Sequence, residues 1–200
     1  AIALDLHAWP EFASQLLGHA WRQRQNLEHR WRGPQGSLID IIPAGSKLRE
    51  QGRIVWPKSE MTMSLAGFDH VFADSVEREL APGLRIKVVP LPVLALLKIL
   101  AFMDNPHARQ KDIEDFAELL QRYEQDSDRR FSDEVFGVGV SFEEAGAFLL
   151  GIDLAHLCTP EEARLLGKFI SQADEGEHPA FAALRRLRSG VDESDKTGID

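Results

Sequence analysis

Residues 91–123 read LPVLALLKILAFMDNPHARQKDIEDFAELLQRY, and this stretch decides how the chain is organised. From Val93 to Met103 nearly every residue is apolar, which predicts a helix buried on almost all sides. Lys98 lies in the middle of that helix. A lysine in such a place either extends its ammonium group to the surface or meets an anion, so both interpretations of Lys98 stay open.

The second half of the stretch predicts an amphipathic helix. At about 100° per residue, its buried stripe consists of Ile113, Phe116, Ala117, Leu120 and Tyr123. Arg109 falls at the centre of this stripe and Asp112 about 60° from it, whereas Lys111 and Asp115 lie about 160° and 120° away. We therefore expect Arg109 and Asp112 to face the interior. Because a cation in the first turn opposes the helix dipole, Arg109 should have an anionic partner, either a ligand or Asp112 itself.

Capping signals divide the rest of this region into helices. Asn105-Pro106 and Thr159-Pro160 each supply an N-cap residue followed by proline at the first helical position, and Glu162 completes a capping box. The periodicity predicts helices near 93–104, 106–124, 142–151, 160–173 and 179–187. The last residues, SGVDESDKTGID, are acidic and poor in large apolar side chains, so we expect a mobile tail.

Residues 1 to about 90 show short strand candidates between Gly and Pro turns. The predicted strands are 1–6, 27–32, 37–42, 53–56, 76–80 and 84–89, and one helix begins near Pro10. The chain is therefore predicted to be an α+β protein. Its parts are an α+β domain over 1–90, a helical region over 91–188 and a tail over 189–200.

The predicted strand within GSLIDIIPAG, residues 36–45, carries the carboxylate of Asp40 between isoleucines. Burying an unpaired carboxylate is costly enough to threaten a domain's net stability. Asp40 should therefore pair with a nearby basic residue on a partly wet strand face, or bind a metal ion. The strand alone leaves both possibilities open.

An aromatic and basic cluster occurs upstream, in WRQRQ and HRWRG. Its second half places Arg30, Trp31 and Arg32 in sequence, and such side chains can stack on and neutralise single-stranded RNA or a tRNA end. The alternative is a solvated strand whose tryptophan lies in the core.

Composition excludes several classes of protein. Asp and Glu outnumber Lys and Arg by 32 to 23, a net charge of −9, which argues against polyanion binding by the whole surface. The single cysteine, Cys158, cannot form an internal disulfide, and no apolar run approaches the length of a membrane span. The seven histidines lack the spacing of a helical zinc site. These features favour a cytoplasmic protein that does not associate with membranes.

The order LIDIIPAG, GRIVWP, MSLAGF, LPVLALLKILAF and ARQKDIEDFAELLQRY resembles the minimal nucleotidyltransferases of the AbiEii/AbiGii-like abortive-infection toxin family. The later segment AGAFLLGIDLAHL is also similar, so the resemblance runs from about residue 1 to 173. It implies a polymerase-β-like nucleotidyltransferase fold with a small mixed sheet and a helical C-terminal region. It also implies a bacterial toxin or defence protein, with an antitoxin protein as a possible partner.

The resemblance assigns roles to individual residues. Asp40 looks like the third carboxylate of a site for two Mg²⁺ ions, which would clamp the attacking and leaving oxygens of a phosphoryl displacement. Lys98 would contact the triphosphate of an NTP, Asp112 would orient Lys98 or the nucleotide, and Arg109 would assist with phosphate. Arg30, Trp31 and Arg32 are the candidates for binding an RNA or protein acceptor.

The family's first motif, a Gly-Ser turn followed by two aspartates one residue apart, is missing from AIALDLHAWPEF. Either the motif lies upstream of residue 1, which we favour, or this is a naturally shortened relative. On either explanation the 200 residues should catalyse poorly, because one carboxylate cannot hold two metal ions. The alternative function is a non-catalytic nucleotidyltransferase-like scaffold that acts as an interaction module.

Overall fold

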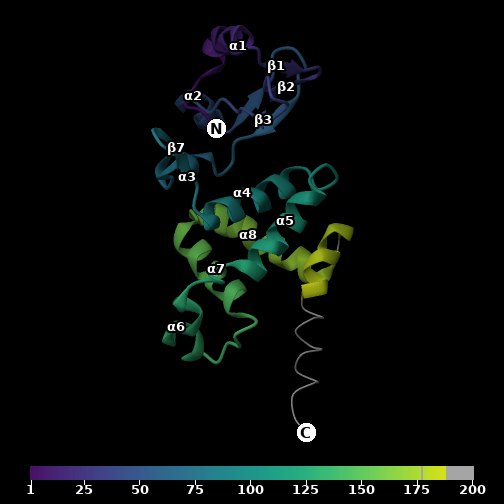
Figure 1. The fold of residues 1–200 in the computed structure, drawn as a ribbon. Helices are drawn as coiled ribbons and strands as arrows, with labels where there is room; N and C mark the ends of the chain where they lie inside the picture. The colour runs from purple at the N-terminus through teal and green to yellow at the C-terminus, as the bar shows by residue number, and fades with distance from the viewer. Residues whose placement is uncertain (177, 188–200) are drawn as a thin grey trace. The chain divides into compact units, whose positions relative to one another are not determined.

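The computed structural model describes residues 1–176 and 178–187 and divides into two compact units, one of Ala1–Ala73 and one from Asp74 onward (Figure 1). The boundary that we predicted near residue 90 therefore falls at residue 73. The difference arises because 76–81 and 84–88 form a two-stranded sheet of their own, which groups with the helical part. The predicted tail over 189–200 lies outside the described residues.

The first unit combines short helices with two small sheets. Its helices are the 3₁₀ helix η1 (Leu6–Ala8), α1 (Trp9–Gly18), α2 (Ser46–Gln51) and α3 (Phe68–Ala73). Its strands are β1 (Arg22–Arg24), β2 (Leu27–Arg32), β3 (Leu38–Asp40), β4 (Arg53–Val55) and β5 (Thr62–Ser64). The sheets have the orders β1-β2-β3 and β4-β5, and all neighbouring strands are antiparallel. The α+β class is thus confirmed, but separate antiparallel sheets replace the expected mixed sheet.

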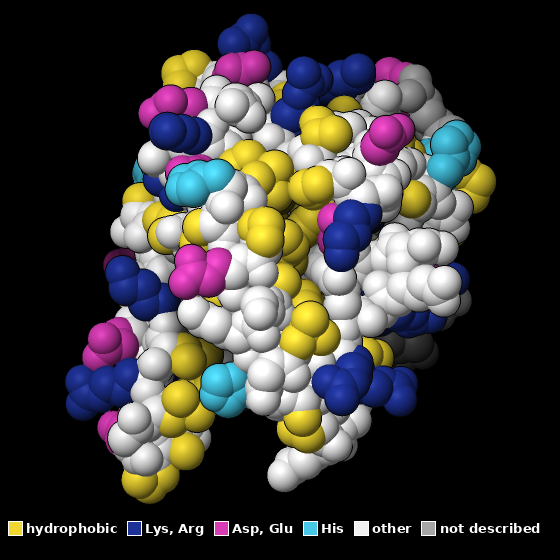
Figure 2. Space-filling model, turned by 90° about the horizontal axis from the view of Figure 1, so that it is seen from above, with side chains coloured by type: hydrophobic (Ala, Val, Ile, Leu, Met, Phe, Trp, Pro, Cys, Tyr) yellow, Lys and Arg dark blue, Asp and Glu magenta, His cyan; other side chains and the backbone are white. Residues whose placement is uncertain are grey.

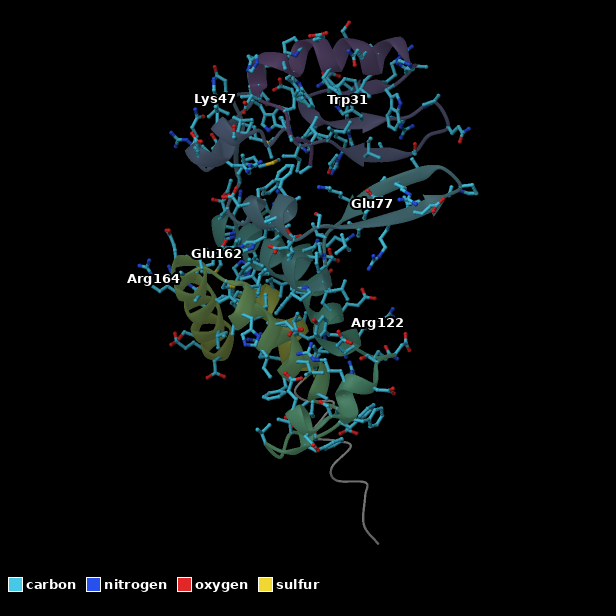
Figure 3. The ribbon with its side chains drawn as sticks, turned by 90° about the vertical axis from the view of Figure 1, so that its left-hand side faces the viewer. Trp31, Lys47, Glu77, Arg122, Glu162 and Arg164 are labelled. Atoms are coloured by element: carbon cyan, nitrogen blue, oxygen red, sulfur yellow. The ribbon has the colours of Figure 1, made fainter. Side chains whose placement is uncertain are left out.

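Three tryptophans form the centre of this unit's core. The ring of Trp9 in α1 meets the rings of Trp56 and Trp31 edge-on, with centroid distances of 5.3 and 6.4 Å. Trp31 is completely buried and lies beneath α1 (Figure 3). Because side chains alternate along a strand, burying His29 and Trp31 of β2 leaves Arg30 and Arg32 on the opposite face.

The segment 1–6 is not the strand that we predicted. Ile2 makes one isolated parallel bridge to Pro43, and its N–H donates to the carbonyl of Ile42 at 3.0 Å. The Leu4 N–H folds back to the carbonyl of Ile2 at 2.8 Å instead of continuing the ladder, so only scattered backbone bonds follow, such as Gly45 N–H to Leu4 O at 2.9 Å. The segment is extended and attached to the unit without forming a sheet strand.

The second unit is a helical bundle preceded by a hairpin. The hairpin strands are β6 (Val76–Ala81) and β7 (Leu84–Val88). The helices are α4 (Leu91–Asp104), α5 (Gln110–Arg122), η2 (Asp128–Phe131), α6 (Asp133–Phe136), α7 (Ala145–Leu157), α8 (Pro160–Glu175) and η3 (Pro179–Phe181). The apolar helix α4 packs against α5, α7 and α8, which confirms its predicted central position. Side chains from all four helices form one hydrophobic core.

Helix boundaries test the capping predictions. The capping box at the start of α8 is confirmed: Thr159 N–H donates to Glu162 Oε2 at 2.9 Å, and Glu162 N–H donates to Thr159 Oγ1 at 3.3 Å. The predicted start at Asn105-Pro106 is wrong, because α5 begins at Gln110. Asn105 Oδ1 instead accepts from Ala108 N–H at 3.3 Å, which closes a turn before the helix.

Two surface properties bear on function. Across residues 1–176 and 178–187, no helix combines the length and apolarity that a membrane crossing requires. On the face shown in Figure 2, Lys and Arg side chains form separate groups with hydrophobic and acidic side chains between them. Positive charge is therefore local on that face, which agrees with the acidic balance of the whole chain.

Candidate functional site

The charged centre of the second unit joins α4 to α5. Lys98 Nζ donates to Asp112 Oδ1 at 2.7 Å and to Asp115 Oδ2 at 2.5 Å. The Lys98 side chain is 23% exposed and that of Asp112 only 13% exposed, so the cluster lies at the edge of the core with a path to solvent. Of the two interpretations of Lys98, contact with an anion is therefore the one that the structure shows. The anions are two carboxylate side chains of the neighbouring helix α5.

Electrostatics fix the charge of this lysine. Partial burial lowers the pKa of the Lys98 ammonium, but its hydrogen bonds to Asp112 and Asp115 outweigh burial and raise the pKa above the ordinary value of 10.5. Lys98 is thus fully protonated at neutral pH. It provides a permanent, positioned cation rather than a group that exchanges protons.

Arg109 completes the cluster. It precedes the first residue of α5, and its Nη1 lies 3.6 Å from Asp112 Oδ2. Its side chain is 45% exposed, so our prediction of an inward-facing arginine is wrong. The prediction assumed helical geometry at residue 109, whereas its backbone has φ −118° and ψ 23°. Its contact with Asp112 matches one of the two anionic partners that we considered for Arg109, the other being a ligand.

Asp115 is the residue whose role the sequence analysis missed. Its helical angle set it well away from the buried stripe, yet its carboxylate reaches Lys98 on α4. The spacing Asp-x-x-Asp in KDIED gave a signal, because side chains three apart lie on one side of a helix and can converge on one cation. The expected inward position of Asp112 and the expected exposed position of Lys111 agree with the structure.

Asp40 belongs to the first unit and is paired. It stands opposite Arg30 in the β2–β3 ladder, and Arg30 donates Nε–H to Asp40 Oδ1 and Nη2–H to Asp40 Oδ2, both at 2.7 Å. The side chains are 36% and 39% exposed. This is the partly wet strand face with a basic partner that we considered beside the metal-binding interpretation. Mg²⁺ would have to replace Arg30 at these oxygens.

The metal-binding types of side chain in the described residues do not assemble into a metal site. Within the described part of the chain, no three His, Cys, Asp or Glu side chains come together in a way that could hold a metal ion. Asp40 offers one carboxylate, and a guanidinium occupies both of its oxygens. These residues alone do not form a site for two Mg²⁺ ions, and the pair of ions expected in the complete site stays a prediction.

The predicted acceptor-binding residues divide between surface and core. Trp31 is 0% exposed, so its ring has no free face on which a base could stack. Arg32 is exposed and stands opposite Arg22 of β1, which is exposed as well. The outer face of this sheet therefore carries Arg22, Arg30 and Arg32 together with Asp40 and Leu38, while the aromatic member of the predicted cluster stabilises the core.

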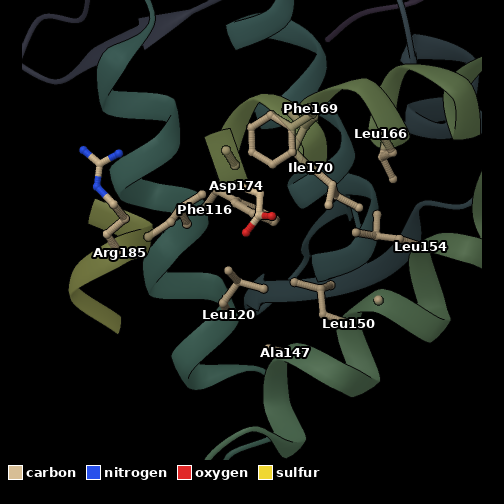
Figure 4. Close-up of a pocket in the computed structure, with 14 residues that line it drawn as sticks. Phe116, Leu120, Ala147, Leu150, Leu154, Leu166, Phe169, Ile170, Asp174 and Arg185 are labelled. Carbon is tan, nitrogen blue, oxygen red and sulfur yellow. The ribbon is translucent and has the colours of Figure 1, made fainter. Parts of the chain in front are cut away.

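A largely apolar pocket of about 390 Å³ lies among α5, α7, α8 and the residues after η3 (Figure 4). Phe116, Leu150 and Phe169 form part of its wall, and Asp174 and Arg185 are its charged lining residues. Its size and apolar lining are typical of small-molecule pockets. The described residues that line the pocket include no member of the Lys98 cluster. The sequence gave no indication of this pocket.

Comparison with family models, curated proteins and solved structures found no match to this chain. The resemblance to the AbiEii/AbiGii-like family consequently stays a prediction from the quoted motifs.

Proposed function

We propose that this chain handles nucleotide phosphates in a nucleotidyltransferase reaction. The reaction is transfer of a nucleoside monophosphate from an NTP to an RNA or protein acceptor, with release of pyrophosphate. The observation that supports it best is the Lys98 cluster, in which two carboxylates of α5 hold a partly exposed ammonium group at a defined position. The family resemblance adds the proposal of a toxin or defence role.

The exposure of its two cations is the feature of the cluster that supports anion binding. Lys98 and Arg109 are balanced by Asp112 and Asp115, so the local charge is close to zero. Two carboxylates hold the ammonium in one orientation, and its remaining exposure lets a phosphate oxygen approach. Arg109, with nearly half of its side chain exposed, supplies a second cation at the surface.

Asp112 and Asp115 also set a limit on the binding strength. A phosphate that reaches Lys98 competes with both carboxylates for the same three N–H donors. We therefore propose Lys98 as a positioning contact for the triphosphate, with Asp112 as the residue that orients it. Arg109 would carry more of the long-range attraction because it is the more exposed cation.

A specific observation favours a second function, that of a non-catalytic scaffold. The carboxylate that the reaction requires, Asp40, is neutralised by Arg30 through both oxygens. A chain that kept this pair intact would retain the fold and bind partners through surfaces such as the arginine face of β1 and β2. The two functions differ in whether label from an NTP is transferred.

The test incubates the complete gene product with each α-³²P-labelled NTP, Mg²⁺ and either total RNA or total protein. The enzyme proposal expects labelled acceptor and pyrophosphate, with label lost in Lys98→Met and in Asp40→Asn. Lys111→Met is the matched control, since Lys111 is an exposed lysine on the same helix as Asp112 and does not belong to the cluster. Transfer that survives Asp40→Asn would refute the role of Asp40, and no transfer with any NTP would favour the scaffold.

A further inference from the structure

An exposed aromatic patch lies in the part of the second unit around α6, at one end of the helical bundle (Figure 1). We call Phe131, Phe136, Val138 and Phe142 the aromatic patch. Their side chains are 63%, 49%, 64% and 41% exposed. Four large apolar side chains exposed within twelve residues is unusual for a surface that faces only water, because single exposed residues are normal but contiguous groups mark interaction sites.

The patch is held in place. Its phenylalanines Phe131 and Phe142 stack on each other, with ring centroids 5.1 Å apart and planes at 26°. Arg130, the neighbour of Phe131, is 5% exposed and donates Nε–H to the carbonyl of Tyr123 at 2.9 Å, which ties the segment to the end of α5. The aromatic side chains are therefore presented on an anchored segment, which lowers the entropy cost of docking a partner.

The surface around the patch is acidic. Residues 126–144 contain six Asp and Glu and only two basic residues, Arg129 and Arg130, and all six acidic residues are exposed. Both arginines are already engaged: Arg129 pairs with Glu134 and Asp153, and Arg130 with backbone carbonyls. The rim consequently presents negative charge that this segment does not neutralise.

Charge decides which partner fits. A second copy of the chain would place one acidic rim against another across a symmetric interface, and like charges there oppose association. Nucleic acid and anionic lipid surfaces are repelled for the same reason. We propose that the aromatic patch docks a partner protein through an amphipathic segment bearing apolar and basic side chains. This proposal does not depend on the nucleotidyltransferase proposal, because it uses different residues.

The test uses two dye-labelled synthetic peptides of 18 residues. Both have leucine at helical spacing on one face; one carries lysine and the other glutamate at the remaining positions. Fluorescence anisotropy should show the Leu/Lys peptide binding at least tenfold more tightly than the Leu/Glu peptide. Phe131→Ser combined with Val138→Ser should weaken Leu/Lys binding by at least about tenfold, as expected for two exposed apolar contacts at an interface. Glu143→Lys should weaken it as well.

Ile170→Ser is the matched control, because Ile170 on α8 is also 64% exposed. It should leave binding unchanged, and far-UV circular dichroism of each variant should match the wild type. Equal binding of the two peptides, or equal loss in the Ile170→Ser control, would overturn the proposal. So would a dimer in size-exclusion chromatography with light scattering that dissociates in the Phe131→Ser, Val138→Ser variant, since the occupant would then be a second copy.

Discussion

Replacing Arg130 by methionine should selectively destabilise the helical unit. Arg130 belongs to η2 and is 5% exposed, and its guanidinium reaches the carboxyl end of α5, where backbone carbonyls have no partners within the helix. It donates Nε–H to Tyr123 O at 2.9 Å and Nη2–H to Gln121 O at 2.7 Å, and Nη2 also bonds Tyr123 O. Methionine fills most of the volume but donates no hydrogen bond.

The size of the effect follows from the two carbonyls. A hydrogen bond from a charged donor contributes about 1.5–3 kcal/mol, and a buried acceptor left without a partner adds a penalty of similar size. Since Gln121 is exposed, water can replace the arginine at one carbonyl but not at the buried one. We therefore expect a loss of about 3–4 kcal/mol in the free energy of unfolding, a large part of the ~5–15 kcal/mol of a typical domain.

The distribution of chromophores allows each unit to be followed separately. All four tryptophans, at positions 9, 21, 31 and 56, lie in the first unit, whereas the bundle helices of the second unit dominate far-UV circular dichroism. With a urea m-value of about 2 kcal/mol/M, the circular dichroism midpoint of Arg130→Met should fall by about 1.5–2 M. The tryptophan fluorescence transition should keep its midpoint if the two units unfold separately.

Arg122→Met provides the control for removing an arginine near the carboxyl end of α5. Arg122 is 71% exposed and makes only an i,i+4 pair with Glu118 at 3.3 Å, which should be worth less than about 0.5 kcal/mol. If Arg130→Met shifts the circular dichroism midpoint no more than Arg122→Met does, the anchoring role of Arg130 is refuted. A shift of both optical transitions together would show that the units unfold as one.

Three further predictions concern the same unit. Gly146→Ala should destabilise it by at least about 1 kcal/mol in urea unfolding, because a Cβ would stand 2.8 Å from Leu120 O, whereas Gly151→Ala has open space and should be neutral or stabilising. Hydrogen bonds from Arg129 are the main cause that lowers the pKa of the Asp153 carboxyl below its ordinary value of 3.8. The stabilisation that Asp153 gives the folded state is therefore present above pH 3.8 and is lost as the pH falls through the lowered pKa. Asp153→Asn should flatten the acid side of a stability–pH profile, and an unchanged slope would contradict this. Thr159→Ala removes the capping box of α8 and should cost about 1 kcal/mol by thermal unfolding.

Local signals in the sequence were sufficient for parts of the fold. The apolar run of α4 and the Thr159 capping box were predictable because one residue pattern determines each of them. The strand over 27–32 was also predicted with its observed bounds. The Asn105-Pro106 start failed because the same residues equally favour a turn, and the structure has that turn, closed by Asn105 Oδ1, before α5 begins at Gln110.

The candidate site was only partly predictable for a similar reason. Helical angles placed Asp112 correctly, but the reach of Asp115 to Lys98 depends on how α4 crosses α5, which no single-helix pattern contains. The Arg30–Asp40 pair was one of two interpretations of Asp40, and the antiparallel register of β2 and β3 is what brings those side chains together. Trp31 was ambiguous because aromatic residues suit both a stacking surface and a core.

Nucleotide binding at Lys98 is the most direct test of the central proposal. Isothermal titration of wild type, Lys98→Met and Lys111→Met with each NTP measures it, with circular dichroism as the check that Lys98→Met remains folded. Loss of one charged phosphate contact of about 1.5–3 kcal/mol predicts a Kd for Lys98→Met that is about 10- to 150-fold weaker, with Lys111→Met unchanged. Equal affinity in folded Lys98→Met and wild type would contradict the proposal that the Lys98 cluster receives the triphosphate.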